Sequence, residues 1–113
     1  MPPVADPRVH ALRSLHALRS LHARLGEVLA RGEWANLGEV DGAIRALLER
    51  LAAGPALDAA GMEAKRRLQQ LHEQARRACA QEVERLRQLL ASHLEYAEGR
   101  SAYMQIDRLL AGR

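Results

Sequence analysis

Apolar residues recur at helical spacing along most of this chain. When successive residues are turned by 100°, the apolar residues between positions 7 and 31 fall on one broad stripe: Leu15, Leu18, Leu21, Leu25, Val28 and Leu29. Residues 33–52 carry a tighter stripe, made of Leu37, Val40, Ile44, Leu47, Leu48 and Leu51. Asp6 is a favourable N-cap before Pro7, and Gly32 is a good residue just past a helix end. The sequence therefore predicts helices over residues 7–31 and 33–52.

A third and longer helical pattern follows the run "AAGPALDAAG", whose glycines and proline predict the main loop. The pattern covers residues 61–98, and one face carries Leu68, Leu71, Ala75, Cys79, Leu86, Leu89 and Leu90. Gly99 predicts a break before a short helical segment over residues 100–111. The apolar side of that segment carries Tyr103, Ile106, Leu109 and Leu110. The second helix is about half as long as the third, so part of the long stripe is either left open or covered by the first helix and the C-terminal segment. An apolar stripe left open would indicate a partner surface.

Length and composition place these helices in one all-α domain. The chain has 113 residues and 48% hydrophobic residues, with no Phe, two Tyr and one Trp. Much of the apolar content is Ala and Leu, which suits helices better than β-sheets. We expect an antiparallel helical bundle of three main helices, with a long third helix, a short C-terminal helical segment and a thin core of helix seams.

Metal, cofactor and catalytic sites are not expected. The stretch "HALRSLHALRSLHARL" places His10, His16 and His22 six residues apart, and each step turns the helix by about 240°. Two histidines on one helix need a spacing of three or four residues to share an ion. His72 and Cys79 are also too far apart, at about 10 Å along the axis. The sequence shows no pairing of nucleophile and base and no glycine-rich phosphate loop, so an enzyme is not expected.

The charge of the chain allows a nucleic-acid partner but does not favour one. The net charge is +3 and the isoelectric point is about 9.7, and no helix-turn-helix pattern or aromatic stacking platform is present. A small basic regulator that binds nucleic acid or a transcription factor stays as an alternative. No apolar run suggests a leader or a membrane span, and the single cysteine fits a reducing compartment. We expect a cytoplasmic protein without membrane insertion.

Three stretches carry a resemblance to a known family. In order, they are "GEWANLGEVDGAIRALLERL", "RRLQQLHEQARRACAQEVERLRQLL" and "GRSAYMQI". A helix entered on a tryptophan, a long helix with an "AC…E…RL" stretch and a C-terminal tyrosine resemble the FliT family of flagellar export chaperones. The resemblance covers residues 33–106.

The resemblance implies a chaperone that binds the C-terminal region of the filament-cap protein FliD. It implies that the chaperone keeps FliD monomeric and delivers it to the flagellar type III export apparatus, where the gate protein FlhA is a docking partner. A chaperone for hook–filament junction proteins is the alternative within this class. Independently of the resemblance, the thin core of leucine and alanine leaves a third alternative, an obligate helical oligomer in which the long helix pairs with itself and from which a partner could displace it.

Eight residues are the candidate partner-binding set: Trp34, Leu68, Leu71, Cys79, Leu86, Leu90, Tyr103 and Ile106. The leucines and Cys79 form the expected cargo stripe on the long helix, with Ile106 as a C-terminal neighbour. Trp34 is interpreted first as a cap on the turn between two helices and second as a cargo contact. For Tyr103, docking on FlhA and packing on the long helix stay open as alternatives.

Overall fold

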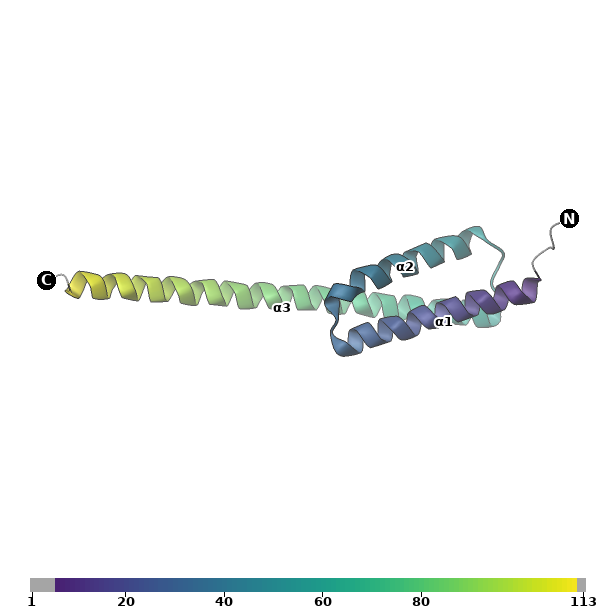
Figure 1. Cartoon of the computed structure of the whole chain (residues 1–113), viewed down its shortest axis with the longest axis horizontal. Coiled ribbons are helices and arrows are strands. Elements are labelled where there is room, and N and C mark those ends of the chain that lie inside the picture. The colour runs from purple at the N-terminus through teal and green to yellow at the C-terminus, as the bar shows by residue number, and fades with distance from the viewer. Residues whose placement is uncertain (1–5, 112–113) are drawn as a thin grey trace. The chain divides into compact units, whose positions relative to one another are not determined.

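The computed structural model describes residues 6–111, with the side chains of all of these except residues 101 and 102. It contains three α-helices: α1 (Pro7–Arg31), α2 (Trp34–Ala53) and α3 (Ala59–Ala111) (Figure 1). No strand occurs among the described residues, so the all-α prediction is confirmed. The sequence predicts one domain, whereas the contacts divide the chain into residues 1–77, the N-terminal unit, and residues 78–113, the C-terminal unit.

The ends of α1 follow from its capping residues. The Asp6 side chain accepts a hydrogen bond from the Arg8 backbone N–H at 2.9 Å, and Pro7 occupies the first turn. At the other end Gly32 has a φ of 65°, in the left-handed region that glycine adopts without strain. The N–H of Gly32 bonds to the Leu29 carbonyl, and that of Glu33 bonds to the Val28 carbonyl. This pair of bonds is a Schellman motif.

The N-terminal unit is an antiparallel three-helix arrangement. In Figure 1, α1, α2 and the first part of α3 run alternately in opposite directions and lie side by side. They share one core, formed by Leu18, Leu25, Val28, Val40, Ile44, Leu47, Ala64, Leu68 and Ala75. All of these are aliphatic, and two of the three that α3 contributes are alanines, so the core is thin, as the composition predicts.

The start of α3 differs slightly from the predicted residue 61. The helix begins at Ala59 because Asp58 caps it, accepting a hydrogen bond from the Gly61 N–H at 2.8 Å. A Cβ at Gly61 would lie 3.2 Å from the Cβ of Leu57 and 3.1 Å from Oδ1 of Asp58. Glycine at this position therefore belongs to the first turn of α3, where the absence of a side chain lets Leu57 and Asp58 pack closely against the backbone.

The predicted break at Gly99 is wrong. The helix α3 continues through Gly99 to Ala111, so residues 100–111 are the end of α3 and not a separate segment. One glycine in a helix interior costs about 1 kcal/mol relative to alanine, which does not end a helix by itself. No proline follows Gly99 to stop the helix.

Replacing Leu68 by alanine should separate a core role from a partner-binding role. Leu68 is fully buried against the other two helices, so Leu68→Ala should lower the free energy of unfolding by about 2–5 kcal/mol. Leu12→Ala is the matched control, because Leu12 is 66% exposed on α1 and its loss should cost no more than about 0.5 kcal/mol. Urea unfolding followed by circular dichroism measures both. Equal, small effects would contradict the core assignment of Leu68.

Candidate partner-binding helix

The exposed apolar side chains are concentrated in the C-terminal unit. Of the fourteen large apolar residues that are exposed among the described ones, eleven lie after residue 77. The described residues of this unit form a single stretch of α3, so the unit has no second helix of its own to cover them. Exposed apolar surface on this scale is typical of a site that binds another protein.

Seven of the apolar residues line one side of this helix. At 100° per residue they fall within about 80° of one another, and the set is called the Leu86 row here. Its members are Cys79, Val83, Leu86, Leu90, Leu94, Ala97 and Met104. Leu86, Leu90 and Leu94 are 51%, 60% and 54% exposed. The row is a narrow apolar strip that is continuous over about five helical turns, from Cys79 to Ala97, and Met104 follows about two turns later.

Polar contacts within the C-terminal unit are local. Glu82 lies at the edge of the Leu86 row and binds Arg85 with two hydrogen bonds, of 3.0 and 2.5 Å. The hydrogen bonds from Arg85 hold the pKa of Glu82 below its ordinary value. The guanidinium of Arg100 lies over the ring of Tyr96, 5.7 Å from its centroid. These contacts join residues three or four apart and stabilise the helix without covering its apolar strip.

The structure places the eight predicted residues in both units. Leu86 and Leu90 are exposed on the Leu86 row, and Cys79 is half-buried at its start. Tyr103 and Ile106 are also exposed, 74% and 53%, on other faces of the same helix.

The other three predicted residues belong to the N-terminal unit. Leu68 is in the core and Leu71 packs against it, so both are explained by packing between helices. Trp34 is half-buried as the first residue of α2, and its Nε1 would lie 3.8 Å from a Cβ at Gly32. This position fits the interpretation of Trp34 as a cap on the turn.

Four residues of the row are absent from the predicted set: Val83, Leu94, Ala97 and Met104. Val83 and Leu94 share the strip with Leu86 and are 42% and 54% exposed. The spacing 83, 86, 90, 94 is the repeat of three and four residues that marks one helix face, and it could have identified both.

Sequence reasoning also missed a polar contact between α2 and α3. In the N-terminal unit Nε2 of His72 contacts Oδ1 of Asp41, and Nε of Arg45 lies 3.0 Å from Oδ2 of the same carboxylate. The side chains of His72 and Asp41 are only 17% and 28% exposed. No spacing rule could pair them, because they lie 31 residues apart on different helices.

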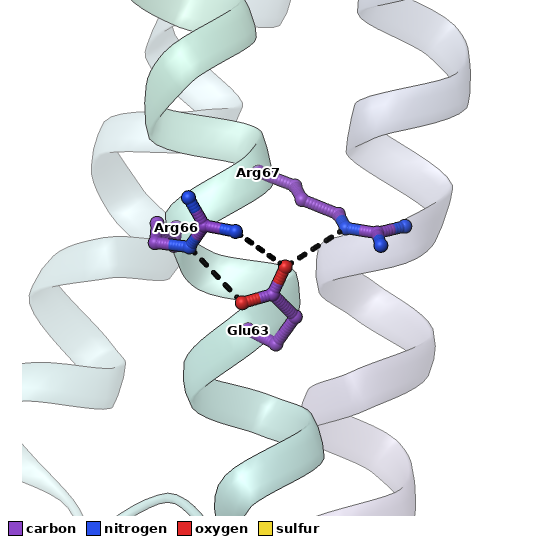
Figure 2. Close-up of polar contacts among 3 residues, drawn as sticks. All are labelled: Glu63, Arg66 and Arg67. Carbon is purple, nitrogen blue, oxygen red and sulfur yellow. Dashed lines mark hydrogen bonds and ion pairs between the residues drawn. The ribbon is translucent and has the colours of Figure 1, made fainter.

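A second polar cluster lies on the first turns of α3. Figure 2 shows Arg66 and Arg67 both directed at the carboxylate of Glu63. Oε1 of Glu63 lies 2.6 Å from Nη2 of Arg66 and 3.1 Å from Nε of Arg67. The hydrogen bond from Arg66 has the largest effect and that from Arg67 the next largest, and they lower the pKa of Glu63 from 4.5 to about 2. The cluster borders a cavity of about 310 Å³ between α1 and α3, where Arg19 and His22 also lie.

A second hollow lies between the start of α1 and the loop before α3. It has a volume of about 730 Å³, and its walls include Leu12, Leu15 and Leu57. Nε2 of His10, also in its wall, is buried without a hydrogen-bond partner. One imidazole among apolar walls does not form the nucleophile and base of a catalytic site.

The described residues offer neither a cluster of metal ligands nor a membrane-spanning helix. No three His, Cys, Asp or Glu side chains among residues 6–111 gather closely enough to hold a metal ion. Over that range no helix combines the length and hydropathy that a membrane crossing requires. The concentration of exposed apolar side chains makes the C-terminal part of α3 the candidate functional surface.

The Glu63 cluster predicts a defined pH dependence. Since the folded pKa is lowered to about 2, the stabilisation by Glu63 is complete above about pH 4.5 and is lost as the pH falls towards 2. Glu63→Gln should therefore destabilise the chain slightly at pH 7, and the difference from the wild type should shrink between pH 4.5 and 2. Thermal unfolding at a series of pH values measures it, with Glu49→Gln on α2 as control. A difference that persists unchanged at pH 2 would contradict the assignment.

Comparison with protein-family models, with curated proteins and with solved structures finds no match for this chain.

Proposed function

We propose that this chain is a non-enzymatic cytoplasmic chaperone that shields an amphipathic segment of a secreted protein. The resemblance to the FliT family makes that protein the filament-cap protein FliD, bound through its C-terminal region and delivered to the flagellar export apparatus. The observation that carries the proposal is the Leu86 row, an apolar strip on a helix that its own unit leaves uncovered.

The energetics of a single helix favour a partner. Helices in proteins owe most of their stability to packing of an apolar face and little to intrinsic propensity. Among residues 78–111 the side-chain contacts that the structure describes are local pairs such as Glu82–Arg85. Full burial of a leucine or valine contributes about 1.5–3 kcal/mol, so covering side chains that are already half exposed gains about 1 kcal/mol each. A partner on the Leu86 row would therefore stabilise the helix as well as bind to it.

The shape and charge of the strip indicate the kind of partner. A narrow apolar row with repeats of three and four residues fits the apolar face of another helix. The residues beside it carry both signs, with Glu82 and Arg100 on one flank and Arg87 and Glu98 on the other. Binding should therefore depend on apolar contact and change little with salt, because exposed charge pairs contribute at most about 1 kcal/mol.

Tyr103 supports the delivery step of the proposal. It is 74% exposed and lies outside the Leu86 row, so a bound cargo on that row leaves its ring accessible. In the resemblance this tyrosine belongs to the "AY" motif associated with docking on FlhA. The two contacts can therefore be tested separately.

Introducing a negative charge into the Leu86 row tests cargo binding. Leu86→Glu should weaken binding of the purified FliD C-terminal segment by about tenfold or more, because a carboxylate would be buried against an apolar face. Leu94→Glu, on the same row, should do the same. Calorimetry at low and high salt measures the affinity, and circular dichroism checks that the helices are retained.

Leu12→Glu is the matched control, since Leu12 is exposed on α1 in the other unit. It should leave the affinity unchanged. Binding that is equally strong in all four proteins would exclude the Leu86 row as the cargo site. Absence of FliD binding, together with salt-sensitive binding of nucleic acid, would favour the basic regulator instead.

A further inference from the structure

The repeat in the first part of the chain places an arginine and a histidine together on α1 twice. In each copy of "ALRSLH" the histidine follows the arginine by three residues, so the two side chains lie on the same side of the helix. The pairs are Arg13 with His16 and Arg19 with His22. Residues 7–26 of α1 hold four arginines, three histidines and no acidic residue, so the helix itself offers these pairs no carboxylate over this range.

The fold gives the two pairs different surroundings. Arg19 and His22 border the cavity of about 310 Å³ between α1 and α3, together with Arg67 of α3. Arg13 and His16 are exposed and line neither this cavity nor the second hollow. The cavity therefore brings two guanidinium groups and an imidazole together from two helices.

The acidic residue at the cavity already has its partners. Among the described residues that line the cavity, only Glu63 is acidic. Its carboxylate accepts two hydrogen bonds from Arg66, of 3.0 and 2.6 Å, and a third from Nε of Arg67. In Figure 2 the two Nη atoms of Arg67 lie on the side of the guanidinium away from Glu63, next to the ribbon of α1. They can therefore donate to a ligand in the cavity.

The charges around the cavity favour an anion. The group of Glu63, Arg66 and Arg67 carries one net positive charge, and Arg19 adds a second. Among the described residues the ion pairs of α1 are made by other arginines, so Arg19 is not neutralised by a carboxylate. Two guanidinium groups at one cavity repel each other, and an anion bound between them attracts both.

The start of α3 adds to the positive potential. Ala60 lies in the first turn of α3 and lines the cavity. The first N–H groups of a helix have no partner within it and carry partial positive charge. Asp58, which caps this end, lines the second hollow and not this cavity. Ala60 and Ala64 also have small side chains, which leave room for a ligand beside the helix.

We propose that this cavity binds the phosphate group of a small molecule through Arg19, His22 and Arg67. A tetrahedral phosphate accepts hydrogen bonds from several directions, so it can bind donors of both helices at once. A carboxylate needs fewer donors, as the paired hydrogen bonds of Arg66 to Glu63 show. The volume is at the lower end of the range for ligand pockets, which suits a small phosphorylated molecule.

The phosphate backbone of a nucleic acid fits this arrangement less well. Double-stranded DNA carries one negative charge about every 1.7 Å, so a row of cations is needed to follow it. Arg13 lies about a third of a turn from Arg19 around α1. Arg24 is engaged with Glu39 of α2. The neighbouring arginines of α1 therefore do not extend the cation cluster into a row.

Titration of the full chain with pyrophosphate tests the site. At constant ionic strength, NMR should show saturable shifts of the Ala60 and Ala64 amides and of the His22 ring. Arg19→Gln should raise the dissociation constant of pyrophosphate by about tenfold, because it removes a charged hydrogen-bond donor. Arg13→Gln is the matched control, since it removes the same charge from the other copy of the repeat, and it should leave the dissociation constant unchanged. Thermal unfolding checks that both variants keep the fold.

Three results would overturn the proposal. Equal weakening by Arg19→Gln and Arg13→Gln would show that pyrophosphate responds to net charge alone. Shifts that do not saturate, or that leave Ala60, Ala64 and His22 unchanged, would exclude the cavity. A short DNA duplex that displaces pyrophosphate at a lower phosphate concentration would overturn the assignment to a small molecule. The cavity lies in the N-terminal unit and the Leu86 row in the C-terminal unit, so these results do not depend on the proposed function.

Discussion

The fold depends on burial of one face of α3. In the N-terminal unit this face supplies Leu68, Ala64 and Ala75 to the core, where they meet Leu18 of α1 and Ile44 of α2. The capped turn at Gly32 and the Asp58 cap hold the three helices in register, so that their narrow stripes can meet. With a core this small, single truncations remove a large part of the total stability, which for proteins is only about 5–15 kcal/mol.

The same apolar periodicity continues beyond the residues that are covered. Leu86, Leu90 and Leu94 repeat the spacing of the core-facing residues, although the described residues of the C-terminal unit form no other helix. Selection of apolar side chains at these positions is understandable if another helix lies there in the functional state. The proposed chaperone role places the amphipathic segment of the cargo on this face of the helix.

The sequence alone predicts the fold class, the caps of α1 and most helix bounds, because these depend on local chemistry. Asp6, Pro7 and Gly32 act on their own neighbours, and the stripes of α1 and α2 are regular. The sequence mispredicts the end of the long helix at Gly99. Glycine costs only about 1 kcal/mol relative to alanine in a helix interior, which does not stop a helix by itself. The division of the apolar face between core and exposed strip could not be predicted. Leu68 and Leu86 look alike in the pattern, and only the position of the helices distinguishes them.

Hydrogen–deuterium exchange of the full chain, with and without the FliD C-terminal segment, tests directly whether a partner covers the Leu86 row. Amide protection reports which helix residues a partner stabilises. We expect the FliD segment to increase the protection of the amides of residues 83–97, while the amides around Ile44 in the core stay as protected as before. Added protection confined to α1 and α2, with residues 83–97 unchanged, would contradict it.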